Sequence, residues 1–273
     1  MPRSPSPSGA DPKVSVVIPA LNEARNLPYV LARLPAEMHE VILVDGHSVD
    51  STIEIARELR QDIRIVMQTR RGKGNALACG FAAATGDIIA MLDADGSADP
   101  AEIPQFVRVL VDGADFAKGS RFIAGGGSED ITRLRTSGNR MLTWLFNTCY
   151  QCRYSDLCYG FNLFWRVHVP ALGLDVAPSP TPLECLLWGD GFEIETLIHV
   201  RAAKAGLRIA EVPSFEHKRL YGASNLHAFS DGLRVLRTVL AERYPRTEKR
   251  SAGAKHIWTG IYPGNHRPRQ VKF

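Results

Sequence analysis

The chain has 273 residues, of which 45% are hydrophobic and 23% are charged, as in an ordinary globular protein. This composition excludes a collagen-like, low-complexity or wholly disordered chain, and no run of about 18 apolar residues predicts a membrane-spanning helix. The formal net charge of +4 is too small and too unevenly placed for a nucleic-acid-binding protein, so we expect no nucleic-acid partner.

The two ends of the chain differ in composition from its middle. Residues 1–13 are rich in Pro, Ser and Gly and are expected to form a disordered leader, not a secretory signal. Residues 245–273 hold seven basic residues and one acidic residue together with aromatic ones, which is typical of a solvated tail or of a segment that contacts lipid headgroups. Five cysteines, an odd number, indicate reduced thiols. We therefore expect a cytoplasmic protein, able to touch the inner face of the membrane, with one domain over residues 14–244.

The first half of the chain alternates short apolar runs with helix-like segments. Apolar runs of this length predict buried strands, and apolar residues at helical spacing predict the helices between them. The predicted strands are residues 14–19, 41–45, 63–68 and 87–93, and the predicted helices are residues 24–34, 51–60 and 75–85. This order predicts an α/β fold with a mostly parallel central sheet and helices on both faces.

The second half is less regular. Its predicted strands are residues 115–122, 159–166 and 207–217, and its predicted helices are residues 133–150, 192–206 and 227–244. A Gly-rich loop, residues 124–130, follows the first of these strands, and Gly206 is expected to close the helix that precedes the last one. No internal repeat or linker divides this half from the first.

Three aspartates follow predicted strands. Asp45 ends the second strand, and Asp93 and Asp95 follow the fourth. The carboxyl ends of parallel strands meet at one edge of the sheet, where such sheets bind ligands. Two carboxylates two residues apart can hold a hard divalent cation and leave positions for a phosphate. The alternative is that Asp93 and Asp95 cap the helix expected near Pro100.

Basic residues lie among glycines at several turns. The segment RRGKGNAL places Arg70, Arg71 and Lys73 at the mouth of a helix, where backbone N–H groups favour phosphate. It matches neither the P-loop nor the GxGxxG pattern of dinucleotide-binding proteins. Further cations near turn glycines are Arg121, Arg133, Lys218 and Arg219. Together with a metal, these cations suit the diphosphate of a nucleotide.

Six motifs, in this order, resemble family 2 glycosyltransferases of the Rossmann-like GT-A fold. They are VSVVIPALNEARNL, VILVDGHSVDST, RRGKGNAL, GDIIAMLDADGSADP, KGSRF and GFEIETLIHVRAAKAGLRIAEVP, and the resemblance extends from about Val14 to Arg243. The nearest likeness is to dolichol- or polyprenol-phosphate mannose synthases and related polyprenyl-phosphate hexosyltransferases. It implies an inverting, metal-dependent transfer of a hexose from a nucleotide-diphosphate sugar, such as GDP-mannose or UDP-glucose, to a polyprenyl phosphate.

The resemblance also implies roles for individual residues. Those that would line the base and ribose of the donor are Pro19, Leu21, Glu23 and Asp45. Asp93 and Asp95 would hold Mg²⁺ or Mn²⁺ and the donor diphosphate. The remaining residues are Arg121 near the transferred group, and Arg133 and Ser137 at the acceptor phosphate. Arg219 would close on the diphosphate, and we expect a lid over residues 217–226, which includes Ser224.

Three positions depart from the family pattern. Gly46 stands where a second acid is common, Ser97 where a metal-binding Gln is common, and Asn225 where the lid often has Lys. These departures leave the nucleotide and the acceptor open.

The acceptor is either a phosphate or a hydroxyl. A phosphate monoester is already anionic and needs cations, whereas a hydroxyl needs a carboxylate or His to take its proton. The candidate bases are Asp190, Glu193 and Glu195, although Asp190 could instead cap the following helix. Because WGDGFEIE resembles the GYxFExE stretch of polyprenol-phosphate enzymes, we expect a polyprenyl-phosphate acceptor, with the hydroxyl of a small molecule or glycan as the alternative.

A nucleotidyltransferase that makes nucleotide sugars is a further alternative, since it shares this type of sheet and a metal site. Such enzymes carry a Gly-rich loop with Arg and Lys after the first strand. The segment PALNEARNL, residues 19–27, occupies that place here, which argues against this class.

Overall fold

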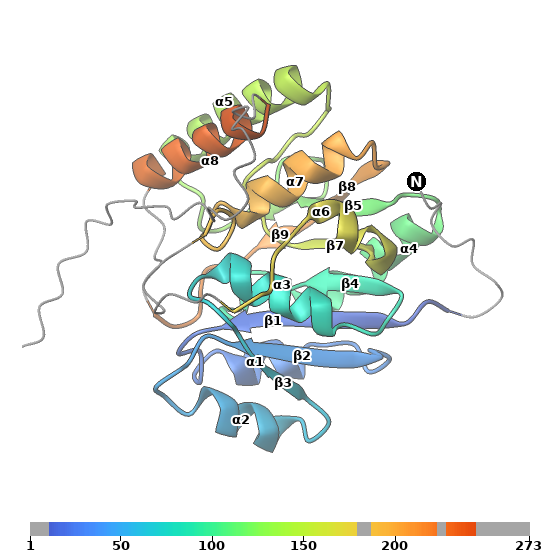
Figure 1. Cartoon of the computed structure of the whole chain (residues 1–273), viewed down its shortest axis with the longest axis vertical. Coiled ribbons are helices and arrows are strands. Elements are labelled where there is room, and N and C mark those ends of the chain that lie inside the picture. Colours follow the sequence, from blue (N-terminus) through green and yellow to red (C-terminus); the bar gives the residue numbers. More distant parts are fainter. Residues whose placement is uncertain (1–10, 179–186, 223–227, 244–273) are drawn as a thin grey trace, which may run out of the picture.

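The computed structural model describes residues 11–178, 187–222 and 228–243 (Figure 1). Most of the expected leader and the whole basic segment 245–273 therefore lie outside the described residues. No helix in the described ranges is both long enough and apolar enough to cross a bilayer.

The described residues form a central seven-stranded sheet in the order β3-β2-β1-β4-β7-β5-β8. Its strands are β1 (Val14–Ala20), β2 (Glu40–Asp45), β3 (Arg64–Met67), β4 (Ile88–Met91), β5 (Phe116–Ser120), β7 (Asn162–Trp165) and β8 (Ile209–Pro213). All neighbouring strands run parallel except that β7 is antiparallel to both β4 and β5. A separate pair, β6 (Gly127–Ser128) and β9 (Phe215–Glu216), joins the Gly-rich loop to the segment after β8.

Helices cover both faces of the sheet, as the sequence predicts. One face is covered by α1 (Leu27–Ala32), α2 (Thr52–Leu59) and α4 (Ile103–Val111), and the other by α3 (Lys73–Ala83), α6 (Val169–Leu172) and α7 (Ile194–Lys204). Strand β1 shows why both faces are apolar, since Val14, Val16 and Ile18 pack on the first side and Val17 on the second.

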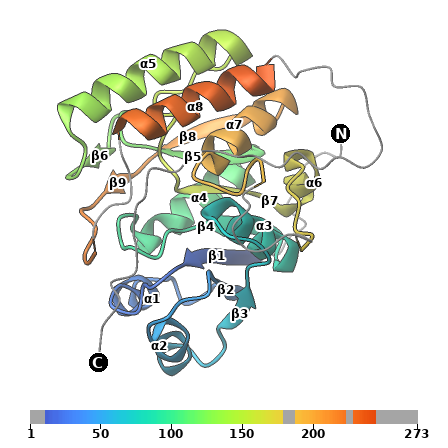
Figure 2. The same cartoon turned by 60° about the vertical axis from the view of Figure 1, so that its left-hand side comes forward.

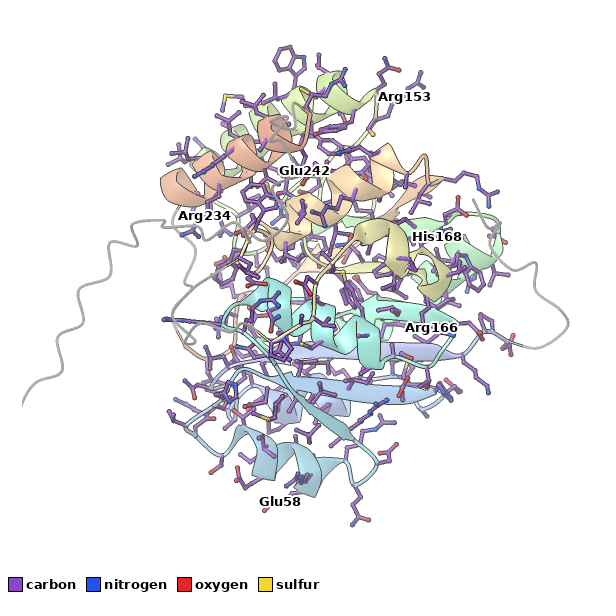
Figure 3. The ribbon with its side chains drawn as sticks, viewed as in Figure 1. Glu58, Arg153, Arg166, His168, Arg234 and Glu242 are labelled. Atoms are coloured by element: carbon purple, nitrogen blue, oxygen red, sulfur yellow. The ribbon has the colours of Figure 1, made fainter. Side chains whose placement is uncertain are left out.

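Two further helices form an outer layer. Helices α5 (Arg133–Tyr150) and α8 (Ala228–Arg243) pack side by side, and both contact α7 (Figure 2). A third apolar cluster, which includes Phe146 of α5, Val200 of α7 and Val239 of α8, joins the three helices. On α8, Glu242 is paired with Arg201 at 3.4 Å and Lys204 at 3.1 Å, so its carboxylate is turned toward α7 (Figure 3).

The predicted elements are confirmed, with adjusted ends. The segment expected as a helix over residues 24–34 is helical only over Leu27–Ala32, and the strand expected over 159–166 is the short β7. Helix α7 ends as predicted, because Gly206 adopts φ +66° directly after it. The helix expected near Pro100 is the short helical turn Pro100–Glu102 followed by α4, and two short helical segments, Arg166–His168 and α6, were not predicted.

Candidate active site

The parallel strands bring their carboxyl ends to one edge, where Asp45 and the segment after β4 lie. Asp45 is fully buried, and its Oδ2 accepts a hydrogen bond from the Ser48 N–H at 2.9 Å. Its Oδ1 has no partner among the described residues. A buried carboxylate oxygen without a partner is costly, so this atom is suited to accept a hydrogen bond from a ligand at the sheet edge.

Lys73 is the central cation of the site. It begins α3, and its Nζ lies 2.7 Å from an oxygen of Asp93 and 2.6 Å from Oε1 of Glu195. Burial disfavours the charged amine, but the two carboxylates outweigh burial and raise the pKa of Lys73 well above its usual value. Lys73 therefore stays protonated, and its two ion pairs connect the segment after β4 to α7.

Arg219 lies between two acids at the same edge. Its guanidinium donates a hydrogen bond to Glu23 and lies 3.5 Å from Oδ2 of Asp95. Burial raises the pKa of Glu23, and the bonds from Asn26 and Arg219 offset part of that rise. The arrangement puts a second cation next to the Asp93–Asp95 pair.

The segment that carries Arg219 is attached to α1. The backbone N–H of Tyr221 donates to Asn26 Oδ1 at 3.0 Å, and its carbonyl accepts from Asn26 Nδ2 at 3.2 Å. The hydroxyls of Tyr221 and Tyr29 are 3.1 Å apart, and Arg25 lies 4.1 Å above the Tyr221 ring. Residues 217–222 thus cover the sheet edge, while Ser224 lies outside the described residues and the proposed lid motion stays a prediction.

Asp93 and Asp95 do not cap the following helical turn. Asp99 does so, because its Oδ1 accepts from the Ala101 N–H at 3.0 Å. Asp93 faces Lys73, and Asp95 accepts from the Ser97 N–H at 3.0 Å. The capping interpretation of this acidic pair is therefore wrong.

Arg121 lies deep in the wall of the site. Its Nε and Nη2 donate to the two oxygens of Asp156 at 2.7 and 2.9 Å, and its Nη1 donates to Glu216 at 2.9 Å. Although burial opposes the charge, these two acids raise the pKa of Arg121 above its usual value. Asn139 donates to the same Asp156 at 3.0 Å, which links α5 to this wall.

Asp190 occupies a different place from the one expected of a base. It is 2% exposed, and its Oδ2 and Oδ1 accept from Arg70 Nε and Nη2 at 2.8 and 2.7 Å. Neither residue is among those that line the pocket described below, and the Arg70 guanidinium is paired with Asp190, so a role for either residue at a phosphate or an acceptor stays a prediction. Of the three candidate acids, Glu195 lines the pocket, and Glu193 accepts from the N–H groups of the loop before α7.

The acceptor pair inferred from the family motif is also displaced. Arg133 and Ser137 are exposed on the outer side of α5 and do not line the pocket. Arg135 and Asn139, two positions further along, do line it. The helical periodicity of the sequence could have predicted the inward position of Asn139, because this residue lies on the same side of the helix as the buried Leu142 and Phe146.

A pocket of about 800 Å³ collects these groups. Its charged end contains Lys73, Asp93, Asp95, Arg121, Glu195 and Arg219. The part lined from α5, α8 and their surroundings contains the apolar side chains of Ile131, Leu134, Met141, Leu142, Phe192 and Leu233, together with the polar ones of Asp130, Arg135, Asn139 and Arg234. His217 also contributes to the lining. This volume is in the range of small-molecule sites, about 300–1,000 Å³.

The candidate metal ligands are oxygen atoms. In the described part of the chain no group of three or more His, Cys, Asp or Glu side chains forms a complete site. Asp93 and Asp95 would supply two carboxylates and leave the other positions to phosphate oxygens and water, which fits Mg²⁺ or Mn²⁺.

The sequence of this chain is similar to those of known glycosyltransferases. The family model described as glycosyl transferase family 2 matches residues 15–169. Uncharacterized glycosyltransferases of Mycobacterium tuberculosis and Mycobacterium bovis are 34% identical over 214 residues, covering 78% of this chain and 89% of theirs. The dolichol-phosphate mannosyltransferase of Pyrococcus furiosus is 35% identical over 125 residues, covering 43% of this chain and 36% of that protein.

Solved structures share the fold. Glucosyl-3-phosphoglycerate synthase of M. tuberculosis, solved with Mn²⁺, UDP-glucose and phosphoglyceric acid, matches with a TM-score of 0.64 at 23% identity. The match covers 85% of this chain and 80% of that one. At this identity the likeness establishes the fold alone, a GT-A-like mixed sheet with helices on both faces.

Proposed function

Because this chain belongs to glycosyl transferase family 2, we propose that it transfers a hexose from a nucleotide-diphosphate sugar to a polyprenyl phosphate. The observation that carries the proposal is the two-ended pocket, with cations and carboxylates at the sheet edge and apolar side chains from α5 and α8 opposite. The charged end suits a diphosphate and an acceptor phosphate, and the apolar end suits the first isoprene units of a lipid acceptor.

The donor would lie across the carboxyl ends of β1, β2 and β4. The unpartnered Oδ1 of Asp45 is suited to an N–H of the base, and Pro19, Leu21 and Glu23 would flank base and ribose. Asp93 and Asp95 would hold Mg²⁺ or Mn²⁺, which when bound helps to neutralise the diphosphate leaving group. Lys73 and Arg219 add two fixed positive charges at the same place.

The transfer itself needs few protein groups. An oxygen of the acceptor phosphate attacks the anomeric carbon, and the bond from that carbon to the diphosphate oxygen breaks on the opposite face, with inversion. The electron pair leaves on the diphosphate, whose charge Lys73 and Arg219 stabilise. No proton has to be removed from the acceptor, which agrees with the absence of Asp190 from the pocket lining.

A hydroxyl acceptor is the second candidate, and one observation favours it. Glu195 lines the pocket next to Lys73, where its carboxylate could take the proton of an attacking hydroxyl. In this reaction the new bond again forms at the anomeric carbon and the nucleoside diphosphate leaves.

The experiment compares acceptors that differ by one group. The purified chain is incubated with labelled GDP-mannose or UDP-glucose, Mn²⁺, and either a short polyprenyl phosphate or the matching polyprenol. We expect lipid-linked sugar from the phosphate alone, none in EDTA, and an inverted anomeric configuration by NMR. Transfer to polyprenol or glycerol-type hydroxyls, lost in Glu195→Gln, would establish the second candidate. Release of pyrophosphate from a sugar phosphate and a nucleoside triphosphate would instead identify a nucleotidyltransferase.

A further inference from the structure

The outer side of α5 and α8 exposes large apolar side chains. Leu134, Met141 and Trp144 of α5 are 58%, 63% and 68% exposed, and Leu233 and Leu240 of α8 are 66% and 40% exposed. Helices α5 and α8 pack side by side (Figures 1 and 2), and Leu134, Met141 and Leu233 line one pocket, so we name the exposed side of these two helices the α5–α8 face. Scattered exposed Leu is ordinary, but five large apolar side chains exposed on two adjacent helices are more than a surface normally carries without a partner.

The same face is basic. Helix α5 contains three arginines and no acidic residue, and two of them, Arg133 and Arg140, are exposed, with Arg140 one helical turn before Trp144. Arg153, just after α5, and Arg237 of α8 are also exposed. Glu242 of α8 is directed toward α7 by its pairs with Lys204 and Arg201, so its charge does not neutralise this face.

The pocket opens onto this face. Leu134, Met141 and Leu233 are exposed and at the same time line the apolar end of the pocket. A ligand with a long apolar chain can therefore extend from the charged end, past these three side chains, to the surface that carries Trp144.

We propose that the α5–α8 face rests on an anionic lipid bilayer, with Trp144, Met141 and the leucines at the headgroup boundary and the arginines on lipid phosphates. Exposed Trp and Leu together with Arg are the composition of interfacial helices. A second copy of the chain fits this face poorly, because a two-fold contact would set the exposed arginines of one copy against those of the other. The link to a lipid acceptor rests on the proposed function, whereas the membrane contact does not.

The test measures vesicle binding of the full chain without any substrate. Flotation with phosphatidylglycerol–phosphatidylcholine vesicles is compared with pure phosphatidylcholine, and we expect binding to the anionic vesicles that weakens with salt. Trp144→Asp should lower the bound fraction about tenfold, since it removes an apolar anchor and adds a repelled charge. The matched control is Leu59→Asp, which adds the same charge at a 50% exposed site on α2, at the opposite end of the molecule near the labelled Glu58 (Figure 3).

A second pair of variants tests the charge. Arg140→Gln should weaken vesicle binding, and the matched Arg57→Gln on the exposed side of α2 should not. No binding by the wild type, or equal binding by wild type and Trp144→Asp, would overturn the proposal and, in the latter case, assign the contact to the basic segment 245–273. A dimer in light scattering that Trp144→Asp dissociates would identify a second copy as the occupant.

The same variant separates this proposal from the proposed function. Trp144 does not line the pocket, so Trp144→Asp should transfer sugar to a short acceptor dispersed in detergent at the wild-type rate. In the wild type, transfer without vesicle binding would overturn the membrane contact alone, and vesicle binding without transfer to a polyprenyl phosphate would overturn the proposed acceptor alone.

Discussion

Asp95 and Asp99 lie on the same loop, but their side chains make different contacts. Asp95 faces Arg219 in the pocket, whereas Asp99 accepts from Ala101 and pairs with Arg33 at the surface. We expect Asp95→Asn to lower kcat by roughly 100-fold or more, because a charged ligand of the proposed diphosphate–metal site is lost. Asp99→Asn is the matched control and should leave kcat unchanged, since Asn also caps helices well. Equal kcat values for Asp95→Asn and the wild type would refute the metal-site assignment.

His199 predicts a pH dependence of stability. It is fully buried in α7 between Phe116 and Tyr154, and neither ring nitrogen has a partner among the described residues. Burial, with Lys118 nearby, holds the pKa of His199 well below its ordinary value of 6.5. Below pH 6.5 the unfolded chain therefore binds a proton that the folded chain does not, so the free energy of unfolding falls as the pH falls.

His199→Leu should remove this contribution. Urea unfolding at pH 7.5 and 5.5 should show that the stability of the variant relative to wild type rises toward low pH, by at most about 1.4 kcal/mol per pH unit. His39→Gln, at an exposed site, is the control. A difference between His199→Leu and wild type that stays constant with pH would contradict the assignment.

The Arg70–Asp190 pair predicts a loss of stability, not of chemistry. Both side chains are buried, and the Asp190 carbonyl also accepts from the Gly74 N–H at 2.7 Å. Asp190→Asn leaves the guanidinium of Arg70 without its counter-charge, so we expect the free energy of unfolding to fall by about 3–5 kcal/mol. The exposed pair of Arg60 and Asp62 is the control, since Asp62→Asn should cost less than about 1 kcal/mol. A catalytic role for Asp190 would instead show as a lost kcat in a variant of normal stability.

At the scale of elements, the attachment of residues 217–222 to α1 predicts the behaviour of Arg219. Arg219→Ala should lower kcat roughly 100-fold while the fold stays intact, because one of the two cations on the diphosphate is removed. The control is Arg33→Ala, which removes an arginine whose side chain is 59% exposed and lies outside the pocket lining. Steady-state kinetics, with circular dichroism to check the fold, would show unchanged kcat if Arg219 does not act on the donor.

Elements were easier to predict than their contacts. Runs of Val and Ile predict the strands, and apolar residues at helical spacing predict the helices, from the local sequence alone. Because consecutive strands joined by helices run parallel, Asp45 and Asp93 are then expected at the same edge of the sheet. The pairing of Arg70 with Asp190 joins residues 120 positions apart through two loops, and no local pattern encodes it. The antiparallel direction of β7 likewise depends on the long connection that precedes it and not on its own four residues.

For the whole molecule, the pocket predicts stabilisation by its donor nucleotide. A nucleoside diphosphate that binds only the folded chain adds about 2.7 kcal/mol of stability at a concentration 100 times its Kd. In a thermal-shift panel with Mn²⁺, we expect either UDP or GDP to raise Tm, and EDTA to abolish most of the shift. The corresponding nucleoside, which lacks the phosphates, is the control. No shift with any nucleotide would contradict the position assigned to the donor.

The position of β7 in the sheet affects how the chain can fold while it is being translated. Strand β4 is followed along the chain by β5, yet β7 lies between them in the sheet. On the ribosome, β4 and β5 emerge well before Asn162–Trp165, by several seconds at about 5–20 residues per second. Until then the edge of β4 that faces β7 has no partner, although every residue of Ile88–Met91 is buried in the finished protein. Between the emergence of β4 and the emergence of β7 a nascent chain of this protein therefore exposes an unpaired apolar strand edge, and a pause in that interval should promote its aggregation.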